Sequence, residues 1–232
     1  MVAVVDVVLV PGFTQTAASW DAVAPLVPDA RAVDIPLRAT FAETAAALGA
    51  MAGAGIYVGY SMGGRLSLRL ALDRPDLVHG LVLVSASPGI TDAGERAARA
   101  RSDEALAQSI ERDGVAVFLD RWLAQPMFAT VPSDAPGLAE RSTLDAPYVA
   151  GCLRVLGAGR MHPMWDELGS LTMPVALVTG TLDEKYDAIA TAMCTRLRAP
   201  VVHVRLEGGH ALPLEQPVAL AAVIAEFAAE HG

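Results

Sequence analysis

The sequence predicts an α/β fold, in which a mostly parallel sheet of about six strands carries helices on both faces and a helical lid insertion. Short β-branched runs alternate along the chain with longer helical patterns. The strand runs are almost continuously apolar, as expected for parallel strands that are buried on both faces. The alternation is interrupted once, over residues 88–171, where only helical patterns occur.

The length fits one domain with an insertion. Single α/β domains often exceed the usual ~150 residues, and this chain has 232 residues. We therefore expect residues 1–87 and 172–232 to form the core and residues 88–171 to form a lid. Hydrophobic residues make up 53% of the chain and charged residues 19%, which excludes a disordered protein.

Charge and composition exclude several classes of partner. The formal net charge of −9 argues against nucleic acid and against an anionic membrane surface. No apolar run approaches the ~18–20 residues of a membrane span, and the first residues lack the basic region of a signal peptide. Cys152 and Cys194 cannot form a disulfide framework, and no Cys/His cluster has zinc spacing. We expect a cytoplasmic monomer or weak homo-oligomer that uses no cofactor and no metal.

The core elements follow one another in βα order. Apolar, β-branched runs predict strands at residues 4–10, 31–35, 56–59, 81–84, 175–179 and 201–206. Helical patterns between or after them predict helices at residues 20–26, 41–51, 63–72, 189–197 and 218–229. Right-handed crossovers between such strands produce a doubly wound sheet.

The insertion contains three helical patterns and a fourth, shorter one. They cover residues 95–111, 115–124 and 147–156 and the neighbourhood of Trp165, and a Pro/Gly/Asp-rich turn over 131–137 separates the second from the third. The chain leaves the predicted sheet after one strand, runs through the insertion, and returns to the sheet at the next strand. It should therefore cover the carboxyl end of the sheet, where open α/β sheets bind ligands.

The motif with the clearest chemistry is Gly-Tyr-Ser-Met-Gly-Gly at residues 59–64. A predicted strand runs directly into it and a predicted helix leaves directly from it. This context is typical of a nucleophile elbow, a strained strand-to-helix turn that lifts a serine above the sheet, here Ser61. An incidental serine in an ordinary tight turn is the alternative. The start of the helix also favours developing negative charge.

A serine nucleophile needs an imidazole and a carboxylate, which in elbow folds follow in the order Ser, acid, His. Asp183 and His210 each follow a later predicted strand, and His210 is preceded by two glycines. Glu184 and Asp187 compete with Asp183, whose alternative role is to cap the next helix. For the oxyanion hole we expect the backbone N–H groups of Met62 and Phe13.

Beyond this elbow, the sequence resembles a family with the α/β-hydrolase fold, the menaquinone-pathway lyases that form 2-succinyl-6-hydroxy-2,4-cyclohexadiene-1-carboxylate (SHCHC synthases). The similar stretches are residues 59–65, 95–99, 121–129, 141–142, 156–160 and 183–186, so the resemblance covers about three-quarters of the chain. Pro11 and residues 34–39 depart from the family pattern.

The resemblance implies that pyruvate is eliminated from 2-succinyl-5-enolpyruvyl-6-hydroxy-3-cyclohexene-1-carboxylate, with the triad acting as a base and no acyl-enzyme. Ser61, Asp183 and His210 would be that triad. The resemblance assigns carboxylate binding to Arg65, Arg99 and Arg141, and it places Tyr60, Trp122 and Lys185 in the pocket wall.

The charge balance independently favours a cluster of arginines. A net-acidic protein repels a polycarboxylate at long range, and the planar guanidinium binds a carboxylate in bidentate fashion. Surface ion pairs are the alternative role for the arginines, core packing for Trp122, and solvation for Lys185. A carboxylesterase or C–C-bond hydrolase with a true Ser61 nucleophile is the second functional hypothesis. A non-catalytic binding protein is the third.

Overall fold

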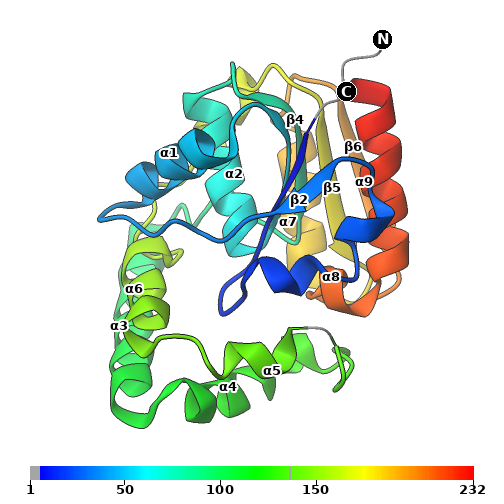
Figure 1. The fold of residues 1–232 in the computed structure, drawn as a ribbon. Coiled ribbons are helices and arrows are strands. Elements are labelled where there is room, and N and C mark those ends of the chain that lie inside the picture. The colour runs from blue at the N-terminus through cyan, green and yellow to red at the C-terminus, as the bar shows by residue number, and fades with distance from the viewer. Residues whose placement is uncertain (1–5, 136) are drawn as a thin grey trace.

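The computed structural model describes residues 6–135 and 137–232, and its centre is a six-stranded parallel sheet (Figure 1). The strands are β1 (Val7–Val10), β2 (Ala30–Ala32), β3 (Gly55–Tyr60), β4 (Val78–Val84), β5 (Val175–Gly180) and β6 (Val201–Leu206). Their spatial order is β2-β1-β3-β4-β5-β6, and every neighbouring pair is parallel. The predicted α/β fold is confirmed, although the start of the first predicted strand, residues 4 and 5, lies outside the described residues.

Strand β2 is shorter than predicted and ends before residue 35. Val33 still donates its N–H to the Leu9 carbonyl, but Leu37 N–H then bonds the Ile35 carbonyl, which turns the chain away from the sheet. Pro36, which has no N–H, lies inside this turn. The Tyr148 hydroxyl donates to the Ile35 carbonyl at 3.1 Å, so the stretch that departs from the family pattern supports a helix of residues 88–171.

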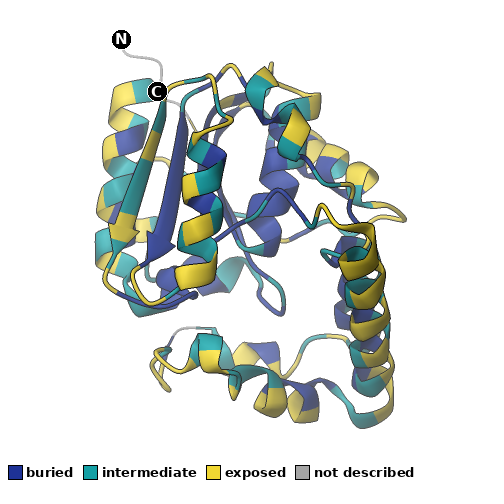
Figure 2. Ribbon diagram, turned by 180° about the vertical axis from the view of Figure 1, so that it is seen from behind, coloured by how far each residue is buried: buried dark blue, intermediate teal, exposed yellow. Residues whose placement is uncertain are grey.

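Helices cover both faces of the sheet. One face packs against α1 (Phe41–Ala52), α2 (Met62–Asp73) and α7 (Glu184–Cys194). The other packs against two 3₁₀ turns, η1 (Ala17–Trp20) and η2 (Ala24–Leu26), and against α8 (Leu212–Glu215) and α9 (Pro217–His231). The inner strands β1, β3, β4 and β5 are almost entirely buried between these two apolar layers, whereas the edge strands β2 and β6 are partly exposed (Figure 2).

Two of the predicted core helices differ from the structure. The prediction of one helix over residues 20–26 is wrong, because Pro25 interrupts backbone hydrogen bonding and two separate 3₁₀ turns form instead. The helix predicted at 189–197 begins earlier, at Glu184, and ends at Cys194. Its first turn, which carries Asp187, lacks the apolar periodicity on which the prediction rested.

Most of residues 88–171 form a separate layer of helices beyond the carboxyl ends of the strands (Figures 1 and 2). The layer comprises α3 (Ala93–Asp113), α4 (Val115–Leu123), η3 (Pro126–Phe128), α5 (Leu138–Arg141) and α6 (Ala146–Leu156). The last element of this segment, η4 (Trp165–Ser170), packs back against α2 in the core. A small apolar core joins α3, α4 and α6, with Ile110, Phe118 and Leu153 among its buried members. The division of the chain into core and lid stays a prediction, but this placement is the one expected of a cover.

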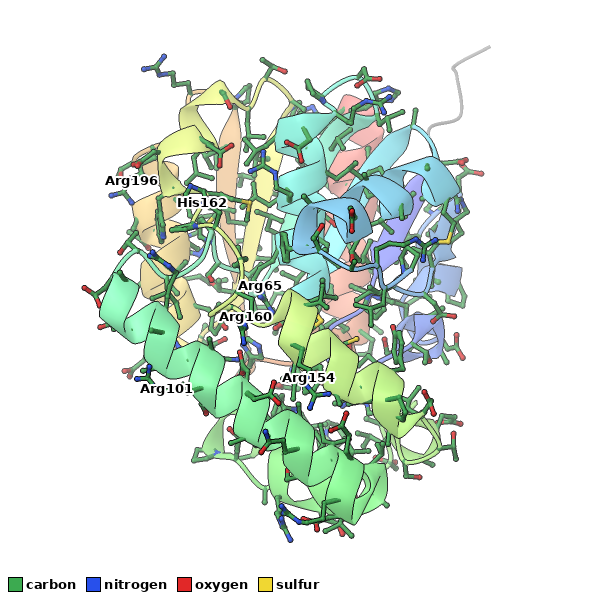
Figure 3. The ribbon with its side chains drawn as sticks, turned by 90° about the vertical axis from the view of Figure 1, so that its left-hand side faces the viewer. Arg65, Arg101, Arg154, Arg160, His162 and Arg196 are labelled. Carbon is green, nitrogen blue, oxygen red and sulfur yellow. The ribbon has the colours of Figure 1, made fainter. Side chains whose placement is uncertain are left out.

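Local signals explain where these helices begin and end. The Asp92 and Asp145 carboxylates cap α3 and α6 by accepting the N–H groups of Glu95 and Tyr148. Gly114, at φ 87°, separates α3 from α4. Arg154 of α6 binds Glu104 and Glu111 of α3, at 3.0 and 2.5 Å, and holds the two helices side by side (Figure 3). Across the described ranges, no helix combines the length and apolar composition that a bilayer crossing requires.

Candidate active site

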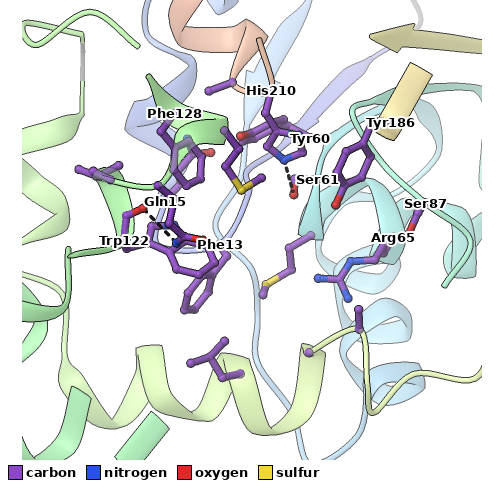
Figure 4. A pocket seen from close by; sticks show the side chains of 18 of the residues that line it. Phe13, Gln15, Tyr60, Ser61, Arg65, Ser87, Trp122, Phe128, Tyr186 and His210 are labelled. Carbon is purple, nitrogen blue, oxygen red and sulfur yellow. Dashed lines mark hydrogen bonds between the residues drawn. The ribbon is translucent and has the colours of Figure 1, made fainter. Parts of the chain in front are cut away.

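Ser61 lies at the sharp turn between β3 and α2. Its backbone has φ 51° and ψ −105°, a conformation that costs energy for any residue with a side chain. Glycines make the turn possible: a Cβ on Gly63 would lie 2.4 Å from the Val10 carbonyl oxygen, and one on Gly59 would lie 2.5 Å from the Gly64 Cα. The close approach that the motif predicts is therefore present, and the serine side chain faces away from the helix (Figure 4).

An imidazole and a carboxylate extend from Ser61 in a line. His210 Nε2 is 3.3 Å from Ser61 Oγ (Figure 4). His210 Nδ1 is 2.7 Å from Asp183 Oδ2. With Nδ1–H donating to the carboxylate, Nε2 presents its lone pair to the serine hydroxyl. The imidazole is 2% exposed, so water competes little for these bonds. This arrangement can remove the hydroxyl proton of Ser61.

The structure distinguishes Asp183 from its two competitors. Asp183 occupies the N-cap position of α7, yet its side chain makes no capping bond and binds His210 instead. Asp187 is engaged by Arg205, at 2.6 Å, and by Thr179. Glu184 is exposed on the helix surface. Among these three carboxylates, Asp183 is the one bonded to the imidazole.

A cavity of about 450 Å³ opens above the serine. It is lined by all eleven residues predicted to form the site: Phe13, Tyr60, Ser61, Met62, Arg65, Arg99, Trp122, Arg141, Asp183, Lys185 and His210. They come from the loop after β1, from the end of β3 and the start of α2, from the loops after β5 and β6, from the start of α7, and from α3, α4 and α5. The cavity therefore lies between the carboxyl end of the sheet and the helices of residues 88–171.

Two of the cavity arginines are buried. Arg65 donates to the Leu156 carbonyl at 2.7 Å and contacts the Met161 sulfur, and burial lowers its pKa to about 10. Arg141 is 4% exposed, and burial lowers its pKa as well. Among the residues that the structure describes, its Nε and Nη2 atoms have no hydrogen-bond partner. Neither guanidinium is neutralised by a carboxylate ion pair in the described part of the chain.

The other two cations are placed less deeply. Arg99 binds Asp103 on the next turn of α3 at 2.8 Å, and its side chain is 40% exposed. The alternative for this arginine was an ion pair with a surface carboxylate; the partner found is instead the buried Asp103, 1% exposed, and Arg99 also lines the cavity. Lys185 is exposed, and its ammonium lies 5.7 Å from the centre of the Tyr186 ring.

Aromatic rings form the remaining wall. Trp122 packs edge-on against Phe13, with ring centres 5.3 Å apart, and stacks on Phe118. Trp122 packs in the core of the helical layer and also lines the cavity, so it has both of the positions that were considered for it. Burial raises the pKa of the Tyr60 and Tyr186 phenols, which keeps them protonated.

Sequence analysis missed several residues of the wall, above all Tyr186 and Phe128. The Tyr186 ring centre is 4.5 Å from that of His210, and Phe128 meets the imidazole edge-on at 6.2 Å. Tyr186 could have been found, because it follows Asp183 by three positions and shares its helix face. Phe128 lies in the stretch 121–129 that resembles the family, but that resemblance gave it no role, and only tertiary packing brings residue 128 to residue 210.

The loop after β1 carries the expected oxyanion donor Phe13. Gln15, which is 5% exposed, accepts the Gly12 N–H at 2.9 Å, and its own N–H bonds the Gly12 carbonyl. These bonds support the loop where the family pattern places a histidine and this chain has Pro11. Met62 begins α2 directly after the serine. The role of these two N–H groups stays a prediction.

Comparison with known proteins identifies the family. The alpha/beta hydrolase family profile matches residues 7–223. The chain belongs to the alpha/beta hydrolase family. Solved structures share the fold: MenH from S. aureus superposes with a TM-score of 0.88 at 23% identity, covering 97% of this chain and 94% of its own. An esterase from Thermogutta terrifontis gives 0.76 at 21% identity, covering 99% and 92%.

Two curated relatives have similar names. A Bacillus subtilis (strain 168) protein, provisionally named 2-succinyl-6-hydroxy-2,4-cyclohexadiene-1-carboxylate synthase, is 29% identical over 95% of this chain and 89% of its own length. An Enterobacter sp. (strain 638) protein of that name is 30% identical over 73% of this chain. The match spans 65% of the Enterobacter protein, just under two-thirds.

Proposed function

We propose that this alpha/beta hydrolase is a lyase that eliminates pyruvate from 2-succinyl-5-enolpyruvyl-6-hydroxy-3-cyclohexene-1-carboxylate and forms 2-succinyl-6-hydroxy-2,4-cyclohexadiene-1-carboxylate. The names of the curated relatives support this substrate. The observation that carries the proposal is the pair of buried guanidinium groups, Arg65 and Arg141, in the same cavity as Ser61. A buried charge is costly unless it is paired, so this cavity suits an anionic ligand.

The proposed chemistry uses the Ser61–His210–Asp183 line as a base. His210 Nε2 takes the Ser61 hydroxyl proton, and Ser61 Oγ takes a proton from the carbon next to the succinyl ketone. The electron pair of that C–H bond moves into the ring as the enolate collapses, and the C–O bond to the enolpyruvyl group breaks. The leaving group departs as enolpyruvate and takes the proton held by the His210 imidazolium, which gives pyruvate and restores the resting triad. No bond forms between serine and substrate. Asp183 stabilises the imidazolium that forms on the way.

The remaining residues would bind the substrate. Its ring carboxylate, succinyl carboxylate and enolpyruvyl carboxylate supply three negative charges, for which Arg65, Arg99 and Arg141 are the proposed partners. Releasing Arg99 from Asp103 would give it a free face for a substrate carboxylate. The N–H groups of Phe13 and Met62 would hold the enolate oxygen. Tyr60, Trp122 and Lys185 would complete the pocket, with residues 88–171 as its lid.

A carboxylesterase or C–C-bond hydrolase is the second candidate. The apolar wall formed by Phe13, Trp122 and Phe128 is the observation that favours it, because an acyl group would pack there. In that reaction Ser61 would attack a carbonyl and form an acyl-enzyme. Buried cations are a poor lining for an apolar acyl chain, which is why the lyase is preferred.

The test is pyruvate release from the enolpyruvyl substrate by purified protein. We expect acceleration over the spontaneous reaction, with Ser61→Ala and His210→Ala both at the spontaneous rate. A p-nitrophenyl ester assayed in parallel should turn over slowly. Rapid ester hydrolysis without accelerated pyruvate release would replace the lyase by the hydrolase. Activity in neither assay, with retained affinity for the substrate, would indicate a binding protein.

A further inference from the structure

The loop that carries His210 is fixed by one carboxylate outside the triad. Glu215 lies at the end of the short helix α8, five residues beyond the histidine. Its Oε2 accepts the Gly209 N–H at 2.5 Å, and its Oε1 accepts the Ala211 N–H at 2.8 Å. The two backbone donors that flank His210 therefore end on the same side chain. Bonds from N–H groups to a carboxylate are short and about twice as strong as neutral ones.

A third bond to Glu215 comes from the helical layer. Thr130, which follows η3, donates its hydroxyl to Glu215 Oε2 at 2.8 Å across 85 residues of sequence. The three groups are packed closely: a Cβ on Gly209 would lie 2.5 Å from Thr130 Oγ1 and 3.2 Å from both Glu215 oxygens. Glycine at 209 is thus required by this contact. Two residues before Thr130, the Phe128 ring also touches the imidazole edge-on.

From these bonds we infer that Glu215 is a positioning residue that couples residues 88–171 to the catalytic imidazole through Thr130. The inference rests on the proposed roles of Ser61 and His210. The Ser61–His210 bond is long, at 3.3 Å, so small displacements of the histidine loop change its alignment. When the helical layer is seated, Thr130 completes the set of donors on Glu215 and the loop is held at both flanks. When that layer moves away, one of the three bonds is lost and the imidazole loosens.

Thr130 offers the cleaner test because its side chain is exposed and its replacement should not disturb folding. Thr130→Val removes the hydroxyl and keeps the shape, whereas Thr130→Ser keeps the hydroxyl. The matched control is Thr143→Val, which removes another exposed hydroxyl of the helical layer that donates only to the Glu140 carbonyl. We expect Thr130→Val to lower kcat for pyruvate release about tenfold, as for one charged hydrogen bond. KM should change little, Thr130→Ser should restore kcat, and Thr143→Val should match the wild type.

Glu215→Gln tests the centre of the contact. The amide keeps one acceptor but turns an NH₂ group toward a backbone N–H, so the loop loses one flank. We expect the histidine loop to shift as a result, and a shift of about 1 Å in a catalytic group lowers the rate about 100-fold. The proton that His210 Nδ1 shares with Asp183 gives a readout without substrate: its downfield NMR signal should broaden in Glu215→Gln and in Thr130→Val, and it should stay sharp in Thr143→Val and Thr130→Ser.

These readouts separate the inference from the proposed function. If the wild type releases no pyruvate, the proposed lyase fails, and the same variants are compared by the rate at which a fluorophosphonate labels Ser61 and by the NMR signal. The inference is overturned if Thr130→Val behaves as Thr143→Val does in rate and in NMR. It is equally overturned if Glu215→Gln leaves the histidine signal unchanged.

Discussion

Arg65 is the residue whose environment says most about the ligand. It stands one helical turn after Ser61 on α2, yet its guanidinium is buried under the helical layer. Its partners among the described residues are the Leu156 carbonyl and the Met161 sulfur. The same helix carries Arg69 one turn later, and that arginine is paired with Asp73 and Glu167. The two arginines therefore lie on the same helix but have different partners, so substitutions at Arg65 and Arg69 can be compared directly.

We expect Arg65→Ala to reduce kcat/KM for the enolpyruvyl substrate by about 1.5–3 kcal/mol, the scale of a charged hydrogen bond. Arg69→Ala should leave this constant within about twofold of the wild type, because it removes only partly exposed ion pairs. Steady-state pyruvate release measures both, with thermal unfolding as a check on folding. Equal effects of the two substitutions would contradict the assignment of Arg65 to the ligand.

Ser61 combines its proposed role with backbone strain. A left-handed conformation with ψ −105° disfavours any side chain, and it is held by the surrounding turn. Ser61→Gly should therefore be more stable than Ser61→Ala by about 1 kcal/mol, after the entropy cost of glycine is subtracted. Both variants should lack triad activity. Chemical denaturation compares them, and a less stable glycine variant would show that the turn is not strained.

At the scale of elements, the pairing of β5, β6 and α7 depends on a polar cluster behind the site. His203 Nε2 lies 2.8 Å from Thr179 Oγ1 and 3.3 Å from Asp187 Oδ1, and Arg205 holds the same carboxylate. The His203 side chain is 9% exposed. Burial, helped by Arg205 and opposed by Asp187, lowers the pKa of His203. Since Asp183 is the N-cap residue of α7, this cluster holds the helix that directly follows the proposed triad acid.

The lowered pKa predicts a loss of stability in acid. The unfolded chain binds a proton at His203 near pH 6.5, whereas the folded chain binds it only at lower pH, so stability falls as pH drops below about 6.5. We expect His203→Gln to show a weaker decline in melting temperature between pH 7 and pH 5 than the wild type. Replacing the exposed His79 in the same way is the control. Parallel declines in all three proteins would refute this role.

The elements that could be predicted are those whose signal is local. The apolar runs of β3 to β6 and the glycines of the elbow are patterns of consecutive residues. Ser61, Asp183 and His210 were predicted because each directly follows a predicted strand, in the order serine, acid, histidine. The short helices α5 and α8 and the turns η1 and η2 depend on how proline and buried side chains pack. The contact of Thr130 with Glu215 joins residues that share no sequence pattern, so only the folded chain reveals it.

For the whole molecule, the net charge is negative, whereas the charged side chains that line the cavity are mostly positive. The chain carries −9, while the cavity gathers Arg65, Arg99, Arg141 and Lys185 against Asp103 and Asp183. Long-range repulsion of a polycarboxylate is screened by salt, but attraction by the buried arginines is screened much less. The molecule therefore attracts its proposed ligand at short range and repels it at long range.

The contrast between a negative molecule and a positive cavity predicts an unusual dependence of kcat/KM on salt concentration. Raising ionic strength from about 0.01 to 0.1 M shortens the Debye length from about 30 to 10 Å, and we expect kcat/KM for the trianionic substrate to rise by about twofold. An uncharged p-nitrophenyl ester serves as the control and should show no change. Stopped-flow or steady-state measurements at several salt concentrations decide this. A steep fall with salt would mean that attraction already dominates far from the cavity.

The order of the strands also bears on synthesis. From β3 onward each new strand joins the same edge of the sheet, with the arginine-bearing helices emerging between β4 and β5. A ribosome thus delivers the serine first, the cationic roof next, and the carboxylate and imidazole last. A nascent chain halted between residues 61 and 210 carries the serine without the imidazole proposed to activate it. The proposed triad therefore cannot react before residue 210 has been synthesised.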